Sequence, residues 1–308
     1  MKNRSLAWAA LAALTPPALL AAGCATSTTR TLETDLAQAL VSPDQENQIG
    51  LQLKTDLDTN QKVVYMTDPT VVNYVRATAD KVIALGKRDR PEVQWQVFVI
   101  DDRKTVNAFA TPGGYLYVYR GLLEMANNEA ELAGVMAHET GHVVARHAAR
   151  SLVESYGLDA VVAMAAGNNP GLVTKLTASV ATNGLMLQHS RADETEADEY
   201  GARYAGGAGY DPRGLISFFT RLKAQVGDVS GLGAYLSDHP ATQERIDHLN
   251  AYIAAQHIAG ANLGAAPYAG IKQRLAVLPT ATPAPSGSSA RPVAPPPSAP
   301  PPAAPPPH

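Results

Sequence analysis

Two kinds of hydrophobic pattern alternate along the chain. Apolar side chains recur every three or four positions in residues 31–40, 43–57 and 71–85, which predicts three helices. In residues 93–100 every second residue is apolar, and the residues between them are Gln94, Gln96, Phe98 and Ile100. This alternation predicts a strand buried on at least one face.

The next segments predict a hairpin followed by many helices. Residues 107–111 and 115–119 read as strands joined by the turn signal Pro112-Gly113-Gly114. From Asn128 onward the pattern is helical, with breaks at residues 167–170, 206–207 and 211–212. The pattern therefore predicts an α+β fold, mostly helical, with a small antiparallel sheet and no internal repeats.

Composition narrows the class of protein. The 308 residues are 45% hydrophobic and 17% charged, which suffices for the core of one domain of good size or of two small ones. One cysteine excludes a disulfide framework within the chain and a cysteine-rich zinc finger. Without residues 1–23 the chain has 23 basic and 28 acidic residues and no basic run, so we expect no nucleic-acid partner.

The first 23 residues have the three parts of a secretory signal. Lys2 and Arg4 precede an apolar run over residues 6–14, and small residues follow. Residues 15–17 interrupt the run, whereas a spanning helix needs roughly 20 apolar residues in succession. A cleaved signal is therefore the prediction, and a permanent transmembrane anchor is the alternative.

The end of this segment resembles the lipobox of bacterial lipoproteins. It reads Leu20-Ala21-Ala22-Gly23-Cys24, and Cys24 is the only cysteine. The resemblance implies that Cys24 is lipidated and that residues 24–42 tether the chain to a membrane, which several acyl chains would hold firmly. Ala25 favours, by the same resemblance, the periplasmic face of the bacterial outer membrane. An ordinary cleaved signal with an unrelated cysteine is the alternative.

Residues 279–308 cannot form a core. They hold 13 of the 23 prolines and one charged residue, Arg291. Such a sequence favours polyproline II, a semi-rigid spacer. We expect a passive disordered tail, with partner binding as the alternative.

The helix that Asn128 is expected to cap, and that is expected to run to Arg150, contains a metal-binding motif. The motif is His138-Glu139-Thr140-Gly141-His142. Its two histidines lie one turn and about 40° apart, so that both imidazoles reach one ion. Neutral imidazole suits Zn²⁺, and the Glu139 carboxylate is placed to reach a water that the ion activates. The alternative is a pair of unrelated core histidines.

A catalytic zinc needs a third protein ligand and an open position. His147 lies about 140° around the helix from His142, so it reads as a packing or helix-end residue. On the helix around residues 191–204, Glu194 shares one face with several small residues that allow a close approach to the first helix. Glu196 lies on the opposite, charged face. Glu194 is therefore preferred over Glu196 as third ligand.

Asp198 lies one helical turn after Glu194, on the same face. There it can accept the second ring N–H of a ligand histidine. A plain surface salt bridge is the alternative for this residue.

Together these residues resemble the gluzincin zinc endopeptidases, the family of HtpX, BepA and the CAAX prenyl and Oma-type proteases. The matching segments are His138-Glu139-x-x-His142, Glu194-x-x-Ala197-Asp198, Asn107-Ala108-Phe109-Ala110, Pro112-Gly113-Gly114, Gly121-Leu122-Leu123 and His239-Pro240 with Arg245. They cover about residues 43–255. The absence of predicted spans beyond the signal places the chain near the soluble lipoprotein branch, and it has no room for the C-terminal helical repeats of BepA.

The resemblance implies peptide-bond hydrolysis with one Zn²⁺ per chain. His138, His142 and Glu194 would be the ligands and Glu139 the general base. His239 and Arg245 would stabilise the oxyanion, or His239 would bind the zinc as a fourth ligand that blocks the water. The alternative makes His239 a residue at a helix start and Arg245 a surface cation.

Residues Asn107, Ala108, Phe109 and Ala110 would form an edge strand that pairs with extended substrates. An ordinary hairpin is the alternative. This places the protease domain at residues 43–260, with a C-terminal extension over 261–278.

The leading hypothesis is thus an envelope zinc endopeptidase that degrades misfolded or stalled outer-membrane or periplasmic proteins. An envelope chaperone or assembly factor with a latent or structural zinc site is the alternative, and a scaffold acting through the tail is a third.

Overall fold

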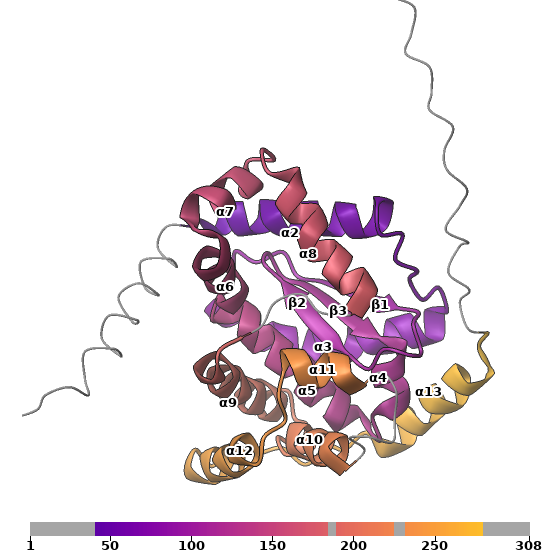
Figure 1. The fold of residues 1–308 in the computed structure, drawn as a ribbon. Coiled ribbons are helices and arrows are strands. Elements are labelled where there is room, and N and C mark those ends of the chain that lie inside the picture. The colour runs from indigo at the N-terminus through magenta and orange to yellow at the C-terminus, as the bar shows by residue number, and fades with distance from the viewer. Residues whose placement is uncertain (1–40, 184–188, 225–231, 280–308) are drawn as a thin grey trace, which may run out of the picture.

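The computed structural model describes residues 41–183, 189–224 and 232–279 (Figure 1). The lipobox, Cys24, the helix expected at 31–40 and the tail after Pro279 lie outside these residues. The described helices are α2 (Pro43–Thr59), α3 (Pro69–Asp89), α4 (Arg120–Met125), α5 (Glu129–Val144), α6 (His147–Tyr156), α7 (Leu158–Ala165), α8 (Pro170–Asn183), α9 (Arg191–Gly207), α10 (Gly214–Ala224), α11 (Leu232–Asp238), α12 (Gln243–Ala255) and α13 (Ala265–Val277). The strands are β1 (Gln96–Ile100), β2 (Ala108–Thr111) and β3 (Tyr115–Tyr119). The predicted α+β class, mostly helical, is confirmed.

The sheet has the order β1-β3-β2 and is mixed, so the prediction of an antiparallel sheet was wrong in part. The tight turn after Thr111 makes β2 and β3 antiparallel, with Phe109 opposite Tyr117. The returning strand β3 then pairs parallel with β1, with Phe98 opposite Tyr117. All five residues of β3 are buried, which explains why this strand takes the middle position.

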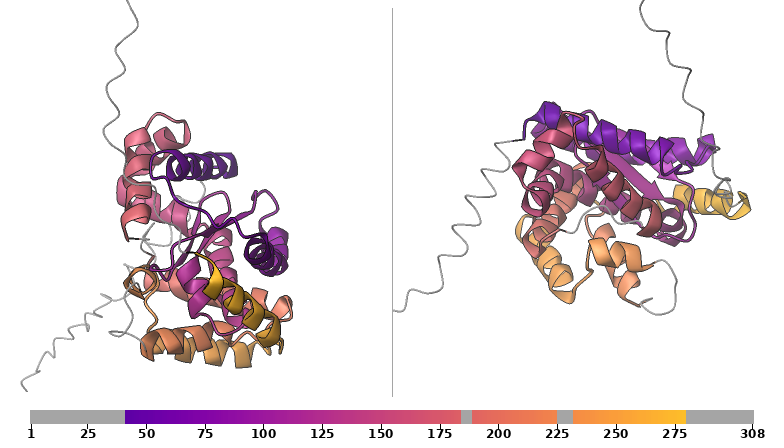
Figure 2. Two further views of the ribbon diagram at one scale, coloured as in Figure 1. Left: turned by 90° about the vertical axis from the view of Figure 1, so that its right-hand side faces the viewer. Right: turned by 45° about the horizontal axis from the view of Figure 1, so that its top comes forward.

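The two faces of β3 carry different side chains because successive residues of a strand point to opposite sides. Leu116 and Val118 belong to the core that α3, α5, α9 and α10 complete. Tyr115, Tyr117 and Tyr119 belong to a second core with α2, α7 and α8. In Figures 1 and 2 these latter helices lie together on one side of the sheet, and α9, α10 and α12 lie on the other.

The helix expected from Asn128 to Arg150 is two helices. Asn128 caps α5 as predicted, since its side chain accepts the N–H of Glu131 at 3.0 Å. The helix ends at Val144, however, because Arg146 adopts the left-handed conformation with φ +61°, and α6 begins at His147. The chain therefore changes direction at Arg146, four residues after the zinc motif.

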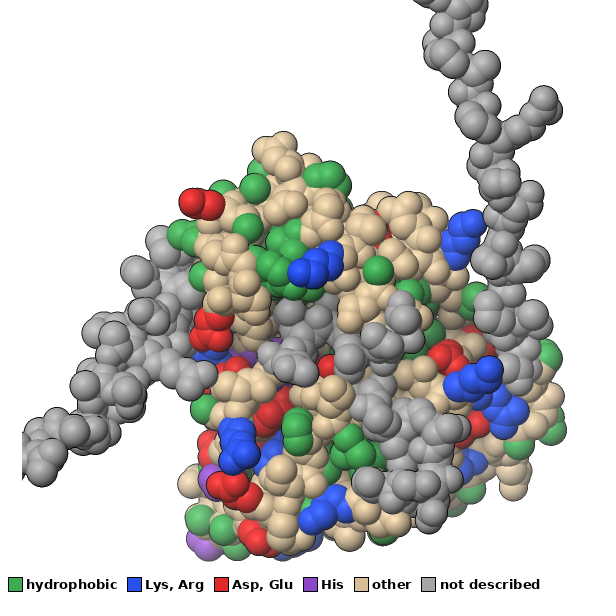
Figure 3. Space-filling model, in the orientation of Figure 1, with side chains coloured by type: hydrophobic (Ala, Val, Ile, Leu, Met, Phe, Trp, Pro, Cys, Tyr) green, Lys and Arg blue, Asp and Glu red, His purple; other side chains and the backbone are tan. Residues whose placement is uncertain are grey.

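The last described helix, α13, packs against the main core through Tyr268, Ile271 and Leu275. The fully buried Arg120 donates to the carbonyls of Leu275, Leu278 and Pro279, which close the C-terminal end of this helix. Among the described helices none is both long and apolar enough to cross a membrane. In the lower half of the face drawn in Figure 3, acidic and basic side chains are interspersed.

Candidate metal centre

Helix α5 places two imidazoles side by side. It is buried along its whole length, and His138 and His142 are 0% and 3% exposed. Their Nε2 atoms lie 3.0 Å apart. Burial lowers the pKa of His142 well below its usual value, and the neighbouring charge of His189 acts in the same direction. His142 is therefore a neutral ring with a lone pair to offer.

Helix α9 brings a carboxylate to the same point. Ser190 caps this helix, accepting the N–H of Asp193 at 3.2 Å, and Glu194 follows in the first turn. Its carboxylate oxygens lie 3.6 Å from Nε2 of His138 and 3.4 Å from Nε2 of His142. Burial raises the pKa of Glu194, but the charge of His239 and the hydrogen bonds from the imidazoles outweigh it, and the pKa lies well below the usual range.

The two helices come this close because small residues lie between them. A Cβ at Gly141 would lie 2.7 Å from Cβ of Tyr200 and 3.0 Å from the carbonyl oxygen of Ala197. A Cβ at Gly201 would lie 3.3 Å from the backbone of His138 itself. Small side chains on α9 were the sequence signal for this contact.

The donor set suits zinc. One atom each from His138, His142, Glu194 and His239 lies within 4.8 Å of all the others, and all four residues are buried. Tetrahedral ligands about 2.0–2.1 Å from a zinc ion lie roughly 3.3 Å from one another. The separations of 3.0–3.6 Å among His138, His142 and Glu194 fit that geometry without a large rearrangement.

Asp198 and Arg245 lie directly behind the imidazoles. Asp198 is 0% exposed, so a surface salt bridge is excluded, and its carboxylate lies 3.0 Å from Nδ1 of His138. Arg245 donates to both oxygens of Asp198 and lies 2.8 Å from Glu194. Burial opposes the ionised form of Asp198, but Arg245 outweighs it and lowers the pKa of this carboxyl. The guanidinium is buried too, and it contacts these two acids and donates to the carbonyl of Pro240 at 2.9 Å.

His239 and Glu139 face each other beside the candidate ligands, and both side chains are buried. Nε2 of His239 lies 3.4 Å from Oε1 of Glu139, and its Nδ1 lies 3.0 Å from Glu194. Burial raises the pKa of Glu139, although the charges of His239 and His138 oppose the shift. Oε1 of Glu139 is buried and has no hydrogen-bond partner among the described residues, which leaves it available to a water or substrate.

The expected substrate strand lies beside Glu139. Ala108 and Phe109 are buried and Ala110 is half-buried, and among the described residues β2 pairs through one edge only. The Ala110 amide opposes the rise in the pKa of Glu139, so this edge faces the carboxylate. Asn107 donates from its side chain to Asp238 at 3.0 Å, which ties the start of β2 to the segment that carries His239.

Two further histidines, His147 and His189, lie at this site, although no sequence pattern assigned either of them a role there. His147 reaches His142 with its Nδ1 atom, and the ring of His189 stacks on that of His142 at a centroid distance of 4.1 Å. A helical wheel could not find His147, because it assumes a continuous helix where Arg146 bends the chain. No pattern in the sequence points to His189, which precedes α9 in an irregular segment.

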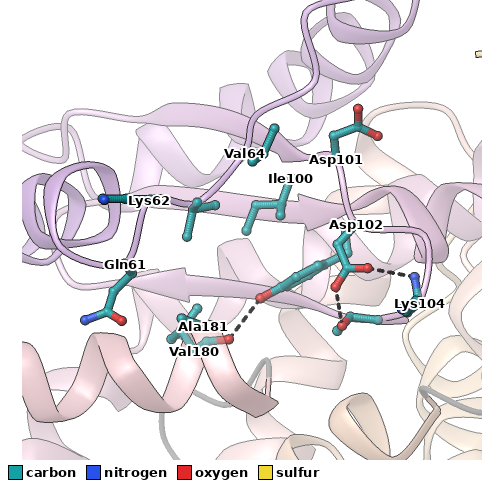
Figure 4. A pocket seen from close by; sticks show the side chains of 12 residues that line it. Gln61, Lys62, Val64, Ile100, Asp101, Asp102, Lys104, Val180 and Ala181 are labelled. Carbon is teal, nitrogen blue, oxygen red and sulfur yellow. Dashed lines mark hydrogen bonds between the residues drawn. The ribbon is translucent and has the colours of Figure 1, made fainter. Parts of the chain in front are cut away.

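A separate cavity of about 400 Å³ lies between β1 and the end of α8 (Figure 4). Ile100, Tyr119 and Val180 line it, and the hydroxyl of Tyr119 donates to the carbonyl of Val180. Its two acids are engaged, Asp101 by Arg120 and Asp102 by Thr105. It contains none of the candidate ligands.

Comparison with known proteins agrees with the geometry. Residues 69–253, more than half of the chain, match Peptidase family M48. The mitochondrial metalloendopeptidase OMA1 of Schizosaccharomyces pombe is 34% identical over 185 residues, which are 60% of this chain and 53% of that protein. The metalloprotease LoiP of Escherichia coli is 33% identical over 196 residues, 62% of this chain and 75% of LoiP.

The beta-barrel assembly-enhancing protease of Escherichia coli is 25% identical over 219 residues, 68% of this chain and 44% of that protein. The chain thus spans about half the length of several of the relatives it matches. The family match includes the helices α5 and α9 that carry His138, His142 and Glu194. On these grounds the chain belongs to peptidase family M48.

Proposed function

We propose that this chain is a zinc-dependent endopeptidase. The observation that carries the proposal is the convergence of His138, His142 and Glu194 on one point, with the Glu139 carboxylate beside them. These three residues would hold a zinc ion, which would supply Lewis acidity toward a water and toward the peptide carbonyl. Two of the relatives named above, OMA1 and LoiP, are named as a metalloendopeptidase and a metalloprotease, which supports the same activity.

The protein's own groups then handle the protons. Glu139 takes a proton from the attacking water and later delivers it to the leaving amine. Burial favours its protonated form, which suits the second step, and the nearby imidazoles favour its ionised form, which suits the first. Burial prevails, and the pKa of Glu139 lies above its usual value.

His239 and Arg245 have different roles in this proposal. Arg245 is bound to Asp198 and Glu194, so we propose that it holds these two acids in place and does not donate to an oxyanion. His239 lies among the candidate ligands, which supports the version in which it takes the fourth position in the absence of substrate. Substrate would then have to displace this imidazole.

Substrates would bind as extended segments along β2. Main-chain pairing with residues 108–111 demands an unfolded or flexible polypeptide and few particular side chains. We propose that misfolded or stalled envelope proteins are the substrates. Two observations support envelope substrates: the name of the beta-barrel assembly-enhancing relative and the lipobox-like segment ending at Cys24.

The membrane placement has its own test. A chain anchored through lipidated Cys24 at the periplasmic face of the outer membrane should incorporate labelled fatty acid and fractionate with that membrane. Cys24→Ser should lose both properties. Unchanged labelling of the Cys24→Ser chain would contradict the anchor.

The activity is tested by digestion of unfolded casein with the purified chain, with and without a zinc chelator. We expect cleavage that the chelator stops and added zinc restores. Glu139→Gln should bind zinc and fold as the parent does and yet cleave nothing, because the base is lost. Cleavage by Glu139→Gln would refute the proposed mechanism. A chain that binds zinc and prevents aggregation without cleaving would instead be a chaperone with a structural site.

A further inference from the structure

A chain of two hydrogen bonds leads away from His142. Its Nδ1 atom lies 2.8 Å from Nδ1 of His147, and both rings are buried. Nε2 of His147 lies 3.2 Å from a carboxylate oxygen of Glu196. The three residues come from α5, α6 and α9, so the contact ties together three helices at the zinc motif.

The protons in this chain can be placed from the roles of the atoms. Nε2 of His142 faces Glu194 and must keep its lone pair free to bind an ion. The hydrogen of this neutral ring therefore lies on Nδ1 and is donated to Nδ1 of His147. His147 then carries its own hydrogen on Nε2 and donates it to Glu196. These two hydrogen bonds, from His142 to His147 and from His147 to Glu196, fix both the tautomer and the orientation of His142.

The turn between α5 and α6 makes this contact possible. On a continuous helix His147 would point about 140° away from His142. The left-handed conformation of Arg146 ends α5, and Arg146 is held there by Glu46, whose carboxylate lies 2.9 Å from its Nε. His147 becomes the first residue of α6 and lies against His142.

The other candidate histidine ligand has a support of the same kind. Nδ1 of His138 faces Asp198, which Arg245 holds in turn. His142 has no carboxylate at its Nδ1 among the described contacts, and a second imidazole stands in that place. Among the described ion pairs, His147 has one other acidic neighbour, Asp193, 3.9 Å from its Nε2, and Asp193 pairs with Arg150.

We propose that His147, backed by Glu196, is a positioning residue that holds His142 in the tautomer and orientation needed for zinc binding. The inference rests on the proposed function, because it concerns the same metal centre. Residues that orient a ligand histidine typically change metal affinity about 10- to 100-fold when they are replaced. The Glu196 side chain is 50% exposed, so its own contribution should be smaller.

The test measures zinc dissociation constants on the full chain by competition with a chromophoric chelator, together with the visible spectrum of the cobalt-substituted protein. His147→Phe keeps a ring and removes the acceptor, and we expect about a 10- to 100-fold weaker affinity and an altered cobalt spectrum. His147→Asn offers a side-chain acceptor near the position of Nδ1 and should recover much of the loss. Glu196→Ala should weaken binding by less than His147→Phe does.

Glu199→Ala is the matched control. Glu199 lies on the same helix and accepts from another imidazole, that of His248, at 2.9 Å, but this pair is away from the candidate ligands. Its replacement should leave the dissociation constant unchanged. A loss equal to that of Glu196→Ala would mean that any charge removed from α9 has this effect, and would overturn the proposal.

Circular dichroism of the metal-free variants shows which of them fold. Wild-type affinity in folded His147→Phe overturns the inference, and if that variant does not fold, wild-type affinity in Glu196→Ala overturns it. The proposed function fails separately, through the parent chain. If that chain binds no zinc, both proposals fall; if it binds zinc and the variants behave as expected but nothing is cleaved, only the endopeptidase proposal falls.

Discussion

The guanidinium of Arg245 forms two parallel hydrogen bonds with Asp198, 2.8 Å from Nε and 2.7 Å from Nη2. Both side chains are buried, at 7% and 0% exposure. The same guanidinium lies 2.8 Å from Glu194 and over the ring of Phe219. One cation therefore compensates two buried carboxylates, of which one supports His138 and the other faces the metal position.

Replacing Arg245 with leucine should destabilise the metal-free protein. Removal of one partner from a buried ion pair costs about 3–5 kcal/mol, because the remaining charges stay buried without compensation. Urea denaturation measures this cost, and saturating zinc should reduce it by providing a positive charge for Glu194. Arg274→Leu is the control, since the Arg274 side chain is 47% exposed and water can take its place beside Asp68, so a smaller change is expected. Equal stability of the parent and the Arg245→Leu chain would refute this role.

Gly141→Ala should separate the two zinc-bearing helices. The new methyl group would lie 2.7 Å from Cβ of Tyr200, so α9 must move away from α5 and take Glu194 with it. Overpacking of this kind costs about 1–3 kcal/mol, and zinc affinity should fall as well. Thermal melting and zinc titration measure the two effects. Gly270→Ala, on α13 with nothing within 4 Å of the added group, should lose neither stability nor zinc.

Zinc binding should release protons at neutral pH. Burial lowers the pKa of His138, but the bonds to Asp198 and Glu194 outweigh it and raise the pKa of the metal-free ring to about 9. Below that pH the ring is charged and must lose a proton before it can bind the ion, so affinity should rise roughly tenfold per pH unit between about pH 7 and 9 and then level off.

Calorimetry of zinc binding in buffers with different ionisation enthalpies counts these protons. We expect at least one at pH 7, and fewer for Asp198→Asn, which removes one of the charges that raise the pKa. A count of zero for the parent chain would contradict the charge assigned to His138.

His239→Ala distinguishes the two roles considered for this residue, a fourth zinc ligand and an oxyanion donor. If the imidazole takes the fourth position on the ion, the variant should cleave casein faster than the parent in the absence of any activator. Slower cleavage would instead support an oxyanion donor. An unchanged rate, both basal and activated, would remove both versions.

Local patterns predicted much of this fold. The turn signal Pro112-Gly113-Gly114 placed strand β3 at residues 115–119 correctly. It could not show that β1 runs parallel to β3, because strand direction depends on which strand takes the middle of the sheet. The tight turn at Gly113 and Gly114, both with positive φ, was readable since glycine favours that conformation.

In the candidate site, too, local patterns were readable and contacts between distant segments were not. Spacing within one helix was enough to pair His138 with His142. The small residues of α9 were enough to prefer Glu194 to Glu196, and the Glu196 side chain contacts His147 instead. Arg245 was expected to stabilise the oxyanion, but its guanidinium is bound to Asp198. The sequence could not show this contact, because residues 47 positions apart carry no mutual signal. The break at Arg146 has no glycine or proline to mark it, so His147 was misplaced.

The central claim is that three side chains from two helices hold one ion. Metal analysis of the purified chain and of Glu194→Ala, both dialysed against a trace of zinc, tests this most directly. We predict one zinc per chain for the parent and close to none for Glu194→Ala, with casein cleavage lost in step. A full equivalent of zinc retained by folded Glu194→Ala would contradict the account.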